Sequence, residues 1–174
     1  EEDETLSGEL PESFLTVDPL DGTIIFSRGC PEWGVLLSYI ERGIPVAGVM
    51  VQPELNRMVS FESGQPPLLK DFAGEVLREI SLGGTEPERL VLGIDINMFT
   101  RPRDLQPILD GLIGSDQVLL GRAPGASIAG TADLLLGAID AYINPRGGKI
   151  WDFAPCAGAV REAGHRLEEL AEAR

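Results

Sequence analysis

The sequence predicts a single layered α/β domain over residues 1–174, in which strands and helices alternate along the chain. Hydrophobic residues make up 43% of the chain, which is enough for a packed core at this length. Apolar runs rich in strand formers alternate with segments of helical spacing. Some of the strands follow one another without a helix between them. This pattern favours a mixed sheet over a plain doubly wound one.

The first third of the chain predicts strands. An acidic stretch over residues 1–12 contains Gly8 and Pro11 and predicts an exposed loop. Four short apolar runs follow it, at residues 13–17, 33–40, 44–51 and 58–61. The second and third runs flank a turn and are almost continuously apolar, so we expect them to form adjacent antiparallel strands of a buried sheet.

The rest of the chain alternates between the two kinds of element. Three further strands are predicted, at residues 90–96, 118–120 and 141–143. Helical spacing and capping residues predict helices at residues 71–80, 104–113, 127–139 and 151–164, with a short charged helical tail at 167–173. In the helix at 151–164, Asp152 lies at the start, Pro155 in the first turn and Gly164 at the end.

The charge balance excludes some classes of partner. Lys and Arg total 14 against 28 Asp and Glu, for a formal net charge of −14. Such a chain repels nucleic acids and anionic membranes. Cys30 and Cys156 fit no metal-ligand spacing, and no apolar run reaches the ~18 residues that span a bilayer. We therefore expect a cytoplasmic protein with reduced thiols. Because the chain begins at Glu1 and not at a methionine, we expect further residues upstream of it.

Residues 18–23, Asp-Pro-Leu-Asp-Gly-Thr, are the stretch most suggestive of chemistry. Two carboxylates lie three residues apart on either side of a proline, which restricts Asp18 and fixes its own φ. Gly22 permits a close approach of a ligand to the main chain. Carboxylate and carbonyl oxygens are the ligands that Mg²⁺ prefers. The stretch alone is equally compatible with a strand that ends in an Asp-Gly turn.

Other motifs occur in a fixed order around this stretch. The chain begins Glu1-Glu2, and later it has Trp-Asp-Phe-Ala at 151–154 and Glu-Ala-Gly at 162–164. Asp152 by itself would be read as a helix N-cap. Together and in this order, the motifs resemble those of the inositol monophosphatase superfamily of Mg²⁺-dependent, Li⁺-sensitive phosphomonoesterases. Residues 48–53 and 125–142 also resemble segments of that family.

The resemblance implies a fold and an assembly. The family has alternating helix and sheet layers, an αβαβα sandwich that fructose bisphosphatases share. Its N-terminal helices lie upstream of the position of Glu1, so the present chain is expected to lack that portion. The family is commonly dimeric, and the apolar strands would suit a homodimer.

The resemblance also implies a site. It assigns metal-binding roles to the carboxylates of Glu1, Asp18, Asp21 and Asp152 and to the carbonyl of Leu20, which would hold two or three Mg²⁺ ions. Gly22 and Thr23 would bind the phosphate of the substrate through their amides at a short helix N-terminus, and Asp152 would also lie at the substrate. Thr23, with Asp21 and Glu1, would act on the attacking water.

The implied function is hydrolysis of a small phosphorylated polyol or sugar. The family usually has Thr-Asn where this chain has Ile24-Ile25, and a family glutamate that binds inositol falls at Pro145. The cations Arg122, Arg146 and Lys149 would suit a second anionic group. The alternatives are therefore a phosphatase for 3′-phosphoadenosine 5′-phosphate or fructose 1,6-bisphosphate, or a non-catalytic member.

Overall fold

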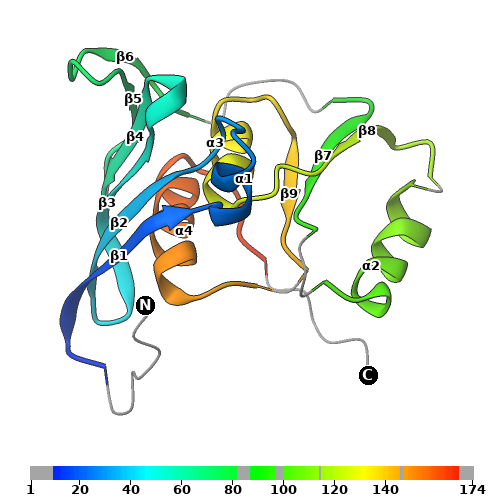
Figure 1. Ribbon diagram of the computed structural model, residues 1–174, viewed down its shortest axis with the longest axis horizontal. Helices are drawn as coiled ribbons and strands as arrows, with labels where there is room; N and C mark the ends of the chain where they lie inside the picture. Colours follow the sequence, from blue (N-terminus) through cyan, green and yellow to red (C-terminus); the bar gives the residue numbers. More distant parts are fainter. Residues whose placement is uncertain (1–9, 82–86, 97–99, 114, 146, 169–174) are drawn as a thin grey trace.

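The computed structural model describes residues 10–81, 87–96, 100–113, 115–145 and 147–168. In these residues two sheets alternate with two layers of helix, so that the order of layers is sheet, helix, sheet, helix (Figure 1). The layered α/β prediction is confirmed. Parallel and antiparallel pairs, however, lie in separate sheets and not in one mixed sheet.

The first sheet has six strands, all antiparallel, in the order of the chain. Its strands are β1 (Ser13–Asp21), β2 (Gly34–Glu41), β3 (Ile44–Gln52), β4 (Arg57–Glu62), β5 (Leu68–Lys70) and β6 (Val76–Glu79). The 3₁₀ turn η1 (Pro53–Leu55) joins β3 to β4. The four strands predicted in the first third of the chain are therefore present, and β1 continues four residues further than predicted.

The second sheet has three parallel strands in the order β8-β7-β9. They are β7 (Leu90–Ile94), β8 (Val118–Arg122) and β9 (Ala141–Ile143). One face of this sheet packs on α2 (Pro102–Ile108), which continues into a π-helical turn, η2 (Leu109–Ile113). Leu92, Ile94 and Ile108 form the small apolar core between them.

The central helical layer consists of α3 (Ser127–Leu135) and α4 (Ile150–Glu162) and lies between the sheets (Figure 1). The larger core fills the space between these helices and the six-stranded sheet. The Phe61 ring packs against Gly48 and Gly158, where any added Cβ would overlap it. This contact lets α4 approach the sheet closely, which fixes the position of the α4 N-terminus relative to β1.

Some predicted boundaries were wrong. Residues 71–80 form a turn and the edge strand β6, not a helix, because Gly74 takes a left-handed conformation (φ 82°) and closes a hairpin with β5. The helix predicted at 127–139 ends at Leu135. Pro155 lies in the second turn of α4, since the helix begins at Ile150. Residues 167 and 168 are not helical, and the remainder of the predicted tail lies outside the described residues.

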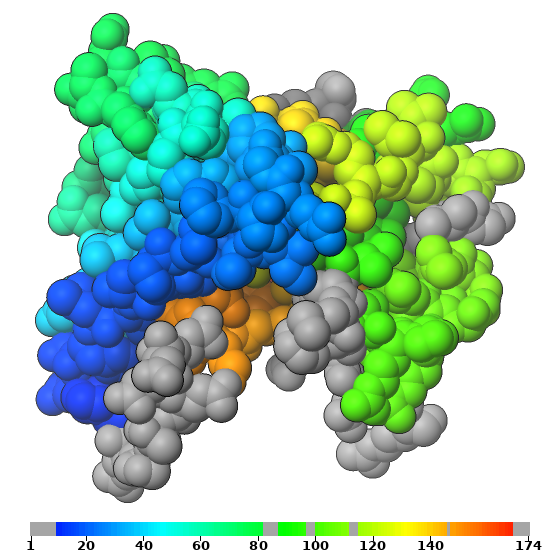
Figure 2. All heavy atoms as spheres, viewed as in Figure 1, coloured from blue at the N-terminus to red at the C-terminus, as the bar shows by residue number. Residues whose placement is uncertain are grey.

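The segment around α1 (Thr23–Ser27) lies at the front of the molecule, between the two sheets (Figure 2). Among the described residues, no helix is long and apolar enough to cross a membrane.

Candidate active site

The corner between β1 and α1 has a backbone that only certain residues can adopt. The β1–β2 register shifts between Asp18 and Asp21, where Pro19 has no N–H to donate. The N–H of Leu20 instead donates to Asp18 Oδ1 at 2.9 Å, an Asx-type turn. Gly22 has a φ of 83°, and α1 begins at the next residue. Asp18 and Asp21 are thereby held at the end of a strand and not on a loop.

Asp21 is fixed from a distant part of the chain. The N–H of Ile128, in the first turn of α3, donates to Asp21 Oδ2 at 2.6 Å across a separation of 107 residues. Gly22 lies under Ala126, which a Cβ at residue 22 would approach to 3.0 Å. The α1 corner therefore packs directly on the N-terminus of α3.

Asp152 comes from the other central helix. It is the third residue of α4, and its Oδ2 accepts the N–H of Lys149 at 2.8 Å. A carboxylate at this position stabilises the first turn of a helix and its dipole. The sequence suggested Asp152 as the N-cap itself, but the N-cap residue is Lys149, and Asp152 caps the helix from its third position.

These three elements bring Asp18, Asp21 and Asp152 together. One carboxylate oxygen from each lies within 4.8 Å of the other two. Asp18 and Asp21 are only 7% and 9% exposed. The group contains oxygen donors only and no histidine or cysteine, which suits a hard cation such as Mg²⁺ better than a soft metal. The predicted metal site thus has three of its residues side by side.

The acids destabilise one another's charged forms. Burial, followed by repulsion from Asp18, raises the pKa of Asp21 from 3.8 to about 6, although the Ile128 amide opposes the shift. Burial also raises the pKa of Asp152, and a hydrogen bond with the Asp18 carboxyl adds to that effect. The raised pKa values of Asp21 and Asp152 favour their protonated forms, and a bound cation would favour the charged forms instead.

Thr23 and Leu20 lie beside the acidic group. The Thr23 hydroxyl donates to the Leu20 carbonyl at 3.1 Å, and Thr23 is exposed to solvent. Since its proton is used in that bond, the lone pairs of Thr23 Oγ1 are available to accept a hydrogen bond from a water molecule. Glu1, the fourth predicted carboxylate ligand, lies outside the described residues.

The side chains next in sequence are apolar. Ile24 is 58% exposed, whereas Ile25 is partly buried against the core and contacts Gly125. Neither side chain supplies a polar group to the site.

Three cations were considered for binding a second anionic group of the substrate. Two of them contact other side chains, and the third lies outside the described residues. Arg122 is paired with Asp133 at 2.9 Å, and the Lys149 ammonium lies 5.7 Å from the centre of the Trp151 ring. Arg146 is outside the described residues. The ion pair of Arg122 with Asp133 therefore gives no support for a bisphosphate substrate.

One carboxylate near the site was not singled out from the sequence. Asp95 follows β7, is 5% exposed and is close enough to Asp21 for their charges to repel. The sequence could have pointed to Asp95, because it is an acidic residue inside the apolar run predicted as a buried strand at 90–96. The Ile128 amide, in contrast, is a backbone group that no sequence pattern identifies.

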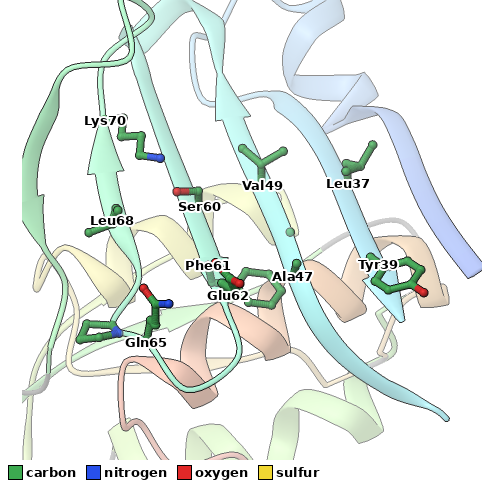
Figure 3. Close-up of a pocket in the computed structure, with 12 residues that line it drawn as sticks. Leu37, Tyr39, Ala47, Val49, Ser60, Phe61, Glu62, Gln65, Leu68 and Lys70 are labelled. Atoms are coloured by element: carbon green, nitrogen blue, oxygen red, sulfur yellow. The ribbon is translucent and has the colours of Figure 1, made fainter. Parts of the chain in front are cut away.

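A shallow hollow of about 420 Å³ lies elsewhere, on the face of the six-stranded sheet that points away from α3 and α4 (Figure 3). Its lining includes Leu37, Tyr39, Val49, Ser60 and Leu68. Leu36, Ser38 and Ile40 alternate with the first two along β2 and are buried on the opposite face. The hollow contains none of the three clustered aspartates.

Comparison with known proteins identifies a family. The model of the family described as "Inositol monophosphatase family" matches residues 1–172. Histidinol-phosphatase of Mycobacterium tuberculosis is 31% identical over 164 residues, which is 88% of this chain and 58% of that protein. Nus factor SuhB of Xylella fastidiosa is 30% identical over 148 residues, or 85% of this chain and 52% of that protein.

A solved structure shows the same fold. The extragenic suppressor protein suhB of Bartonella henselae superposes with a TM-score of 0.79 at 27% identity, covering 94% of this chain and 61% of that one. The chain thus spans between half and two thirds of the length of these relatives.

Proposed function

Because the chain belongs to the inositol monophosphatase family, we propose that the protein is a Mg²⁺-dependent phosphomonoesterase whose site lies at the β1–α1 corner. The observation that carries the proposal is the convergence of Asp18, Asp21 and Asp152, from two distant parts of the chain, within 4.8 Å. Bringing together two buried carboxyl groups and a partly buried one is costly unless a cation compensates their charge.

The proposed ligand set follows from the donors present. Asp18, Asp21 and Asp152 would hold the metal, with the Leu20 carbonyl and Glu1 as further oxygen ligands. When bound, Mg²⁺ neutralises phosphate charge and lowers the pKa of a coordinated water. The hydrogen bonds from Ile128 and Lys149 restrain Asp21 and Asp152, because each fixes one carboxylate oxygen in place.

Gly22 and Thr23 would position the substrate and the water. Their amides lie at the start of α1, where intrahelical acceptors are lacking, and would bind phosphate oxygens. Thr23 Oγ1 would accept a hydrogen bond from the attacking water, since its own O–H donates to the Leu20 carbonyl. Water would then approach the phosphorus in a fixed orientation.

For the substrate, we propose a small phosphorylated polyol or sugar. Histidinol phosphate is a further candidate substrate, because a relative of 31% identity is named a histidinol-phosphatase. A bisphosphate is less favoured, because Arg122 is occupied by Asp133.

Phosphate release by the full-length protein tests this function. The substrates are inositol 1-phosphate, histidinol phosphate, 3′-phosphoadenosine 5′-phosphate and fructose 1,6-bisphosphate, each with Mg²⁺, with Mg²⁺ plus Li⁺, and with EDTA. We expect Mg²⁺-dependent turnover of a monophosphate and its inhibition by Li⁺. Absence of Mg²⁺-dependent turnover on all four substrates would contradict the enzymatic proposal.

A non-catalytic role is the second candidate. It is supported by the similarity to a relative named a Nus factor and by the apolar residues Ile24 and Ile25 next to the site. In that case the protein would bind a divalent cation in calorimetry but release no phosphate from the panel. Restoring polar residues in the double variant Ile24→Thr, Ile25→Asn would then test whether these two side chains account for the loss.

A further inference from the structure

Gly34 is a glycine that its own backbone conformation does not require. It is the first residue of β2, it is buried, and it is not among the glycines with a positive φ. A glycine in a strand costs conformational entropy and adds no side chain to the packing. It often marks a place where another part of the chain approaches closely.

The segment that approaches Gly34 is the first turn of α3. A Cβ at residue 34 would overlap Cδ1 of Ile128, the second residue of that helix, and the carbonyl oxygen of Val51 on β3. Ile128 is completely buried. Its side chain therefore lies in the space that the missing side chain of Gly34 leaves open.

Gly34 and Ile128 are both neighbours of Asp21. Asp21 and Gly34 are paired residues of β1 and β2. The Ile128 N–H donates to Asp21 Oδ2 at 2.6 Å. Asp21 is thus held from two sides, by the start of β2 and by the first turn of α3, and these two segments touch each other at Gly34.

The residue after Asp21 lies between the same two segments. A Cβ at Gly22 would lie 3.0 Å from Cβ of Ala126, just before α3, and 3.5 Å from Cα of Trp33, just before β2. The close approach therefore extends over two adjacent residues of the corner. A side chain at residue 34 would push either the start of β2 or the first turn of α3 away from Asp21, because overpacking a filled core shifts the backbone.

We propose that Gly34 is a positioning residue for the cation site: the space left by its missing side chain accommodates the Ile128 side chain, which holds the first turn of α3 at hydrogen-bonding distance from Asp21. This inference rests on the proposed function. The hydrogen bond fixes the Asp21 carboxylate before a cation binds. Partners that orient a metal ligand in this way commonly contribute roughly 10- to 100-fold to metal affinity.

Cation binding by the full-length protein tests the role of Gly34. The dissociation constant for Mg²⁺ is measured by isothermal titration calorimetry. In EDTA, the NMR chemical shift of the Ile128 amide proton and its exchange with solvent report on the hydrogen bond to Asp21. We expect Gly34→Ala to bind Mg²⁺ about tenfold more weakly, with the Ile128 amide proton shifted upfield and exchanging faster.

Gly93→Ala is the matched control. Gly93 is also a buried strand glycine without a positive φ, and a Cβ there would lie 2.6 Å from Cδ1 of Ile139, another buried isoleucine. It belongs to β7 in the other sheet, so this variant adds the same methyl group at a different place in the core. Both variants should lose stability, but Gly93→Ala should keep the Mg²⁺ affinity and the Ile128 amide signal of the wild type.

Shortening Ile128 tests whether space is the cause. Ile128→Ala removes Cδ1 and keeps the N–H, so the double variant Gly34→Ala, Ile128→Ala should bind Mg²⁺ more tightly than Gly34→Ala alone. If Gly34 has only a structural role, Gly34→Ala will lose no more affinity than Gly93→Ala, or the double variant will bind no more tightly than Gly34→Ala. Either result overturns the proposal.

Ile128→Ala alone keeps the proposal testable if Gly34→Ala fails to fold. It leaves the space beside Gly34 empty, so it should weaken Mg²⁺ affinity and speed the exchange of the amide at residue 128. An unchanged affinity would overturn the proposal. A wild-type protein that binds no divalent cation would instead refute the proposed function, whereas the effect of these variants on the amide at residue 128 would still test how Asp21 is positioned.

Discussion

The helices α2 and α4 begin in the same way but are used differently. In each, the third residue is an aspartate whose Oδ2 accepts the N–H of the residue before the helix, at 2.9 Å for Asp104 and 2.8 Å for Asp152. Asp104 lies beside Arg103, whose side chain is 71% exposed. Asp152 lies beside Asp18 and Asp21.

The comparison shows that an aspartate that caps a helix can also belong to a group of converging acids. The local sequence determines the cap, because the cap needs only the first turn of its own helix. Whether the second oxygen binds a cation depends on what the rest of the fold places opposite it. In α4, that is the end of β1.

The largest expected difference between the two helices is in activity and cation binding. Asp152→Asn keeps the size of the side chain and an oxygen for the cap but removes the charge. We expect kcat/KM for the best substrate of the panel to fall by at least about 100-fold, since a metal site supplies several kcal/mol of transition-state stabilisation. Asp104→Asn should remain within about twofold of wild type. An equal fall in kcat/KM in the two variants would contradict the proposed role of Asp152 as a metal ligand.

The pH dependence of stability should also separate the two helices. Folding raises the pKa of Asp21 from 3.8 to about 6, so the folded protein holds a proton there that the unfolded chain has released. The metal-free protein should therefore lose stability as pH rises from about 4 to 7, by up to ~1.4 kcal/mol per pH unit for each such group. Urea unfolding in EDTA across this range measures the slope.

Two further measurements test this predicted pH dependence of stability. Asp152→Asn should reduce the slope, whereas Asp104→Asn, outside the acidic group, should leave the wild-type slope. Saturating Mg²⁺ should abolish the loss of stability at higher pH, because the cation favours the deprotonated acids. A metal-free protein that becomes more stable between pH 4 and 7 would contradict the sign of the effect.

The smallest expected difference is in the stability of alanine variants without metal. Loss of an N-terminal helix cap costs about 1 kcal/mol, which we expect for Asp104→Ala. Asp152→Ala loses the same kind of cap but also relieves crowding with Asp18 and Asp21, so it should cost less. Urea midpoints in EDTA at pH 7 measure both. A greater cost for Asp152→Ala would show that relief of repulsion is negligible.

The sequence predicted the parts of the fold and site that depend on local chemistry. Periodic apolar runs identified the strands β1 to β4, and the glycine singled out in the Asp-Gly corner, Gly22, has a left-handed φ of 83° that few other residues adopt. Apolar spacing at Phe72, Val76 and Ile80 was misleading, because only Ile80 is buried and Phe72 and Val76 are about half exposed on an edge hairpin.

The parts that depend on tertiary contacts could not be predicted from residue types alone. The amide of Ile128 binds Asp21 regardless of the Ile128 side chain, so no residue preference marks it. Asp95 was visible only as an exception within an apolar strand. The separation of parallel and antiparallel pairs into two sheets likewise depends on how α3 and α4 pack between them, which strand patterns do not encode.

The hydrogen bond between Ile128 and Asp21 has a consequence for protein synthesis. The strand that carries Asp18 and Asp21 leaves the ribosome before the helix that restrains Asp21, and before the one that carries Asp152. A nascent chain therefore cannot bring the three aspartates together until α4 has docked. If this group binds a cation as proposed, the cation would stabilise only molecules in which α4 has docked, by about 2.7 kcal/mol at a free concentration 100 times Kd.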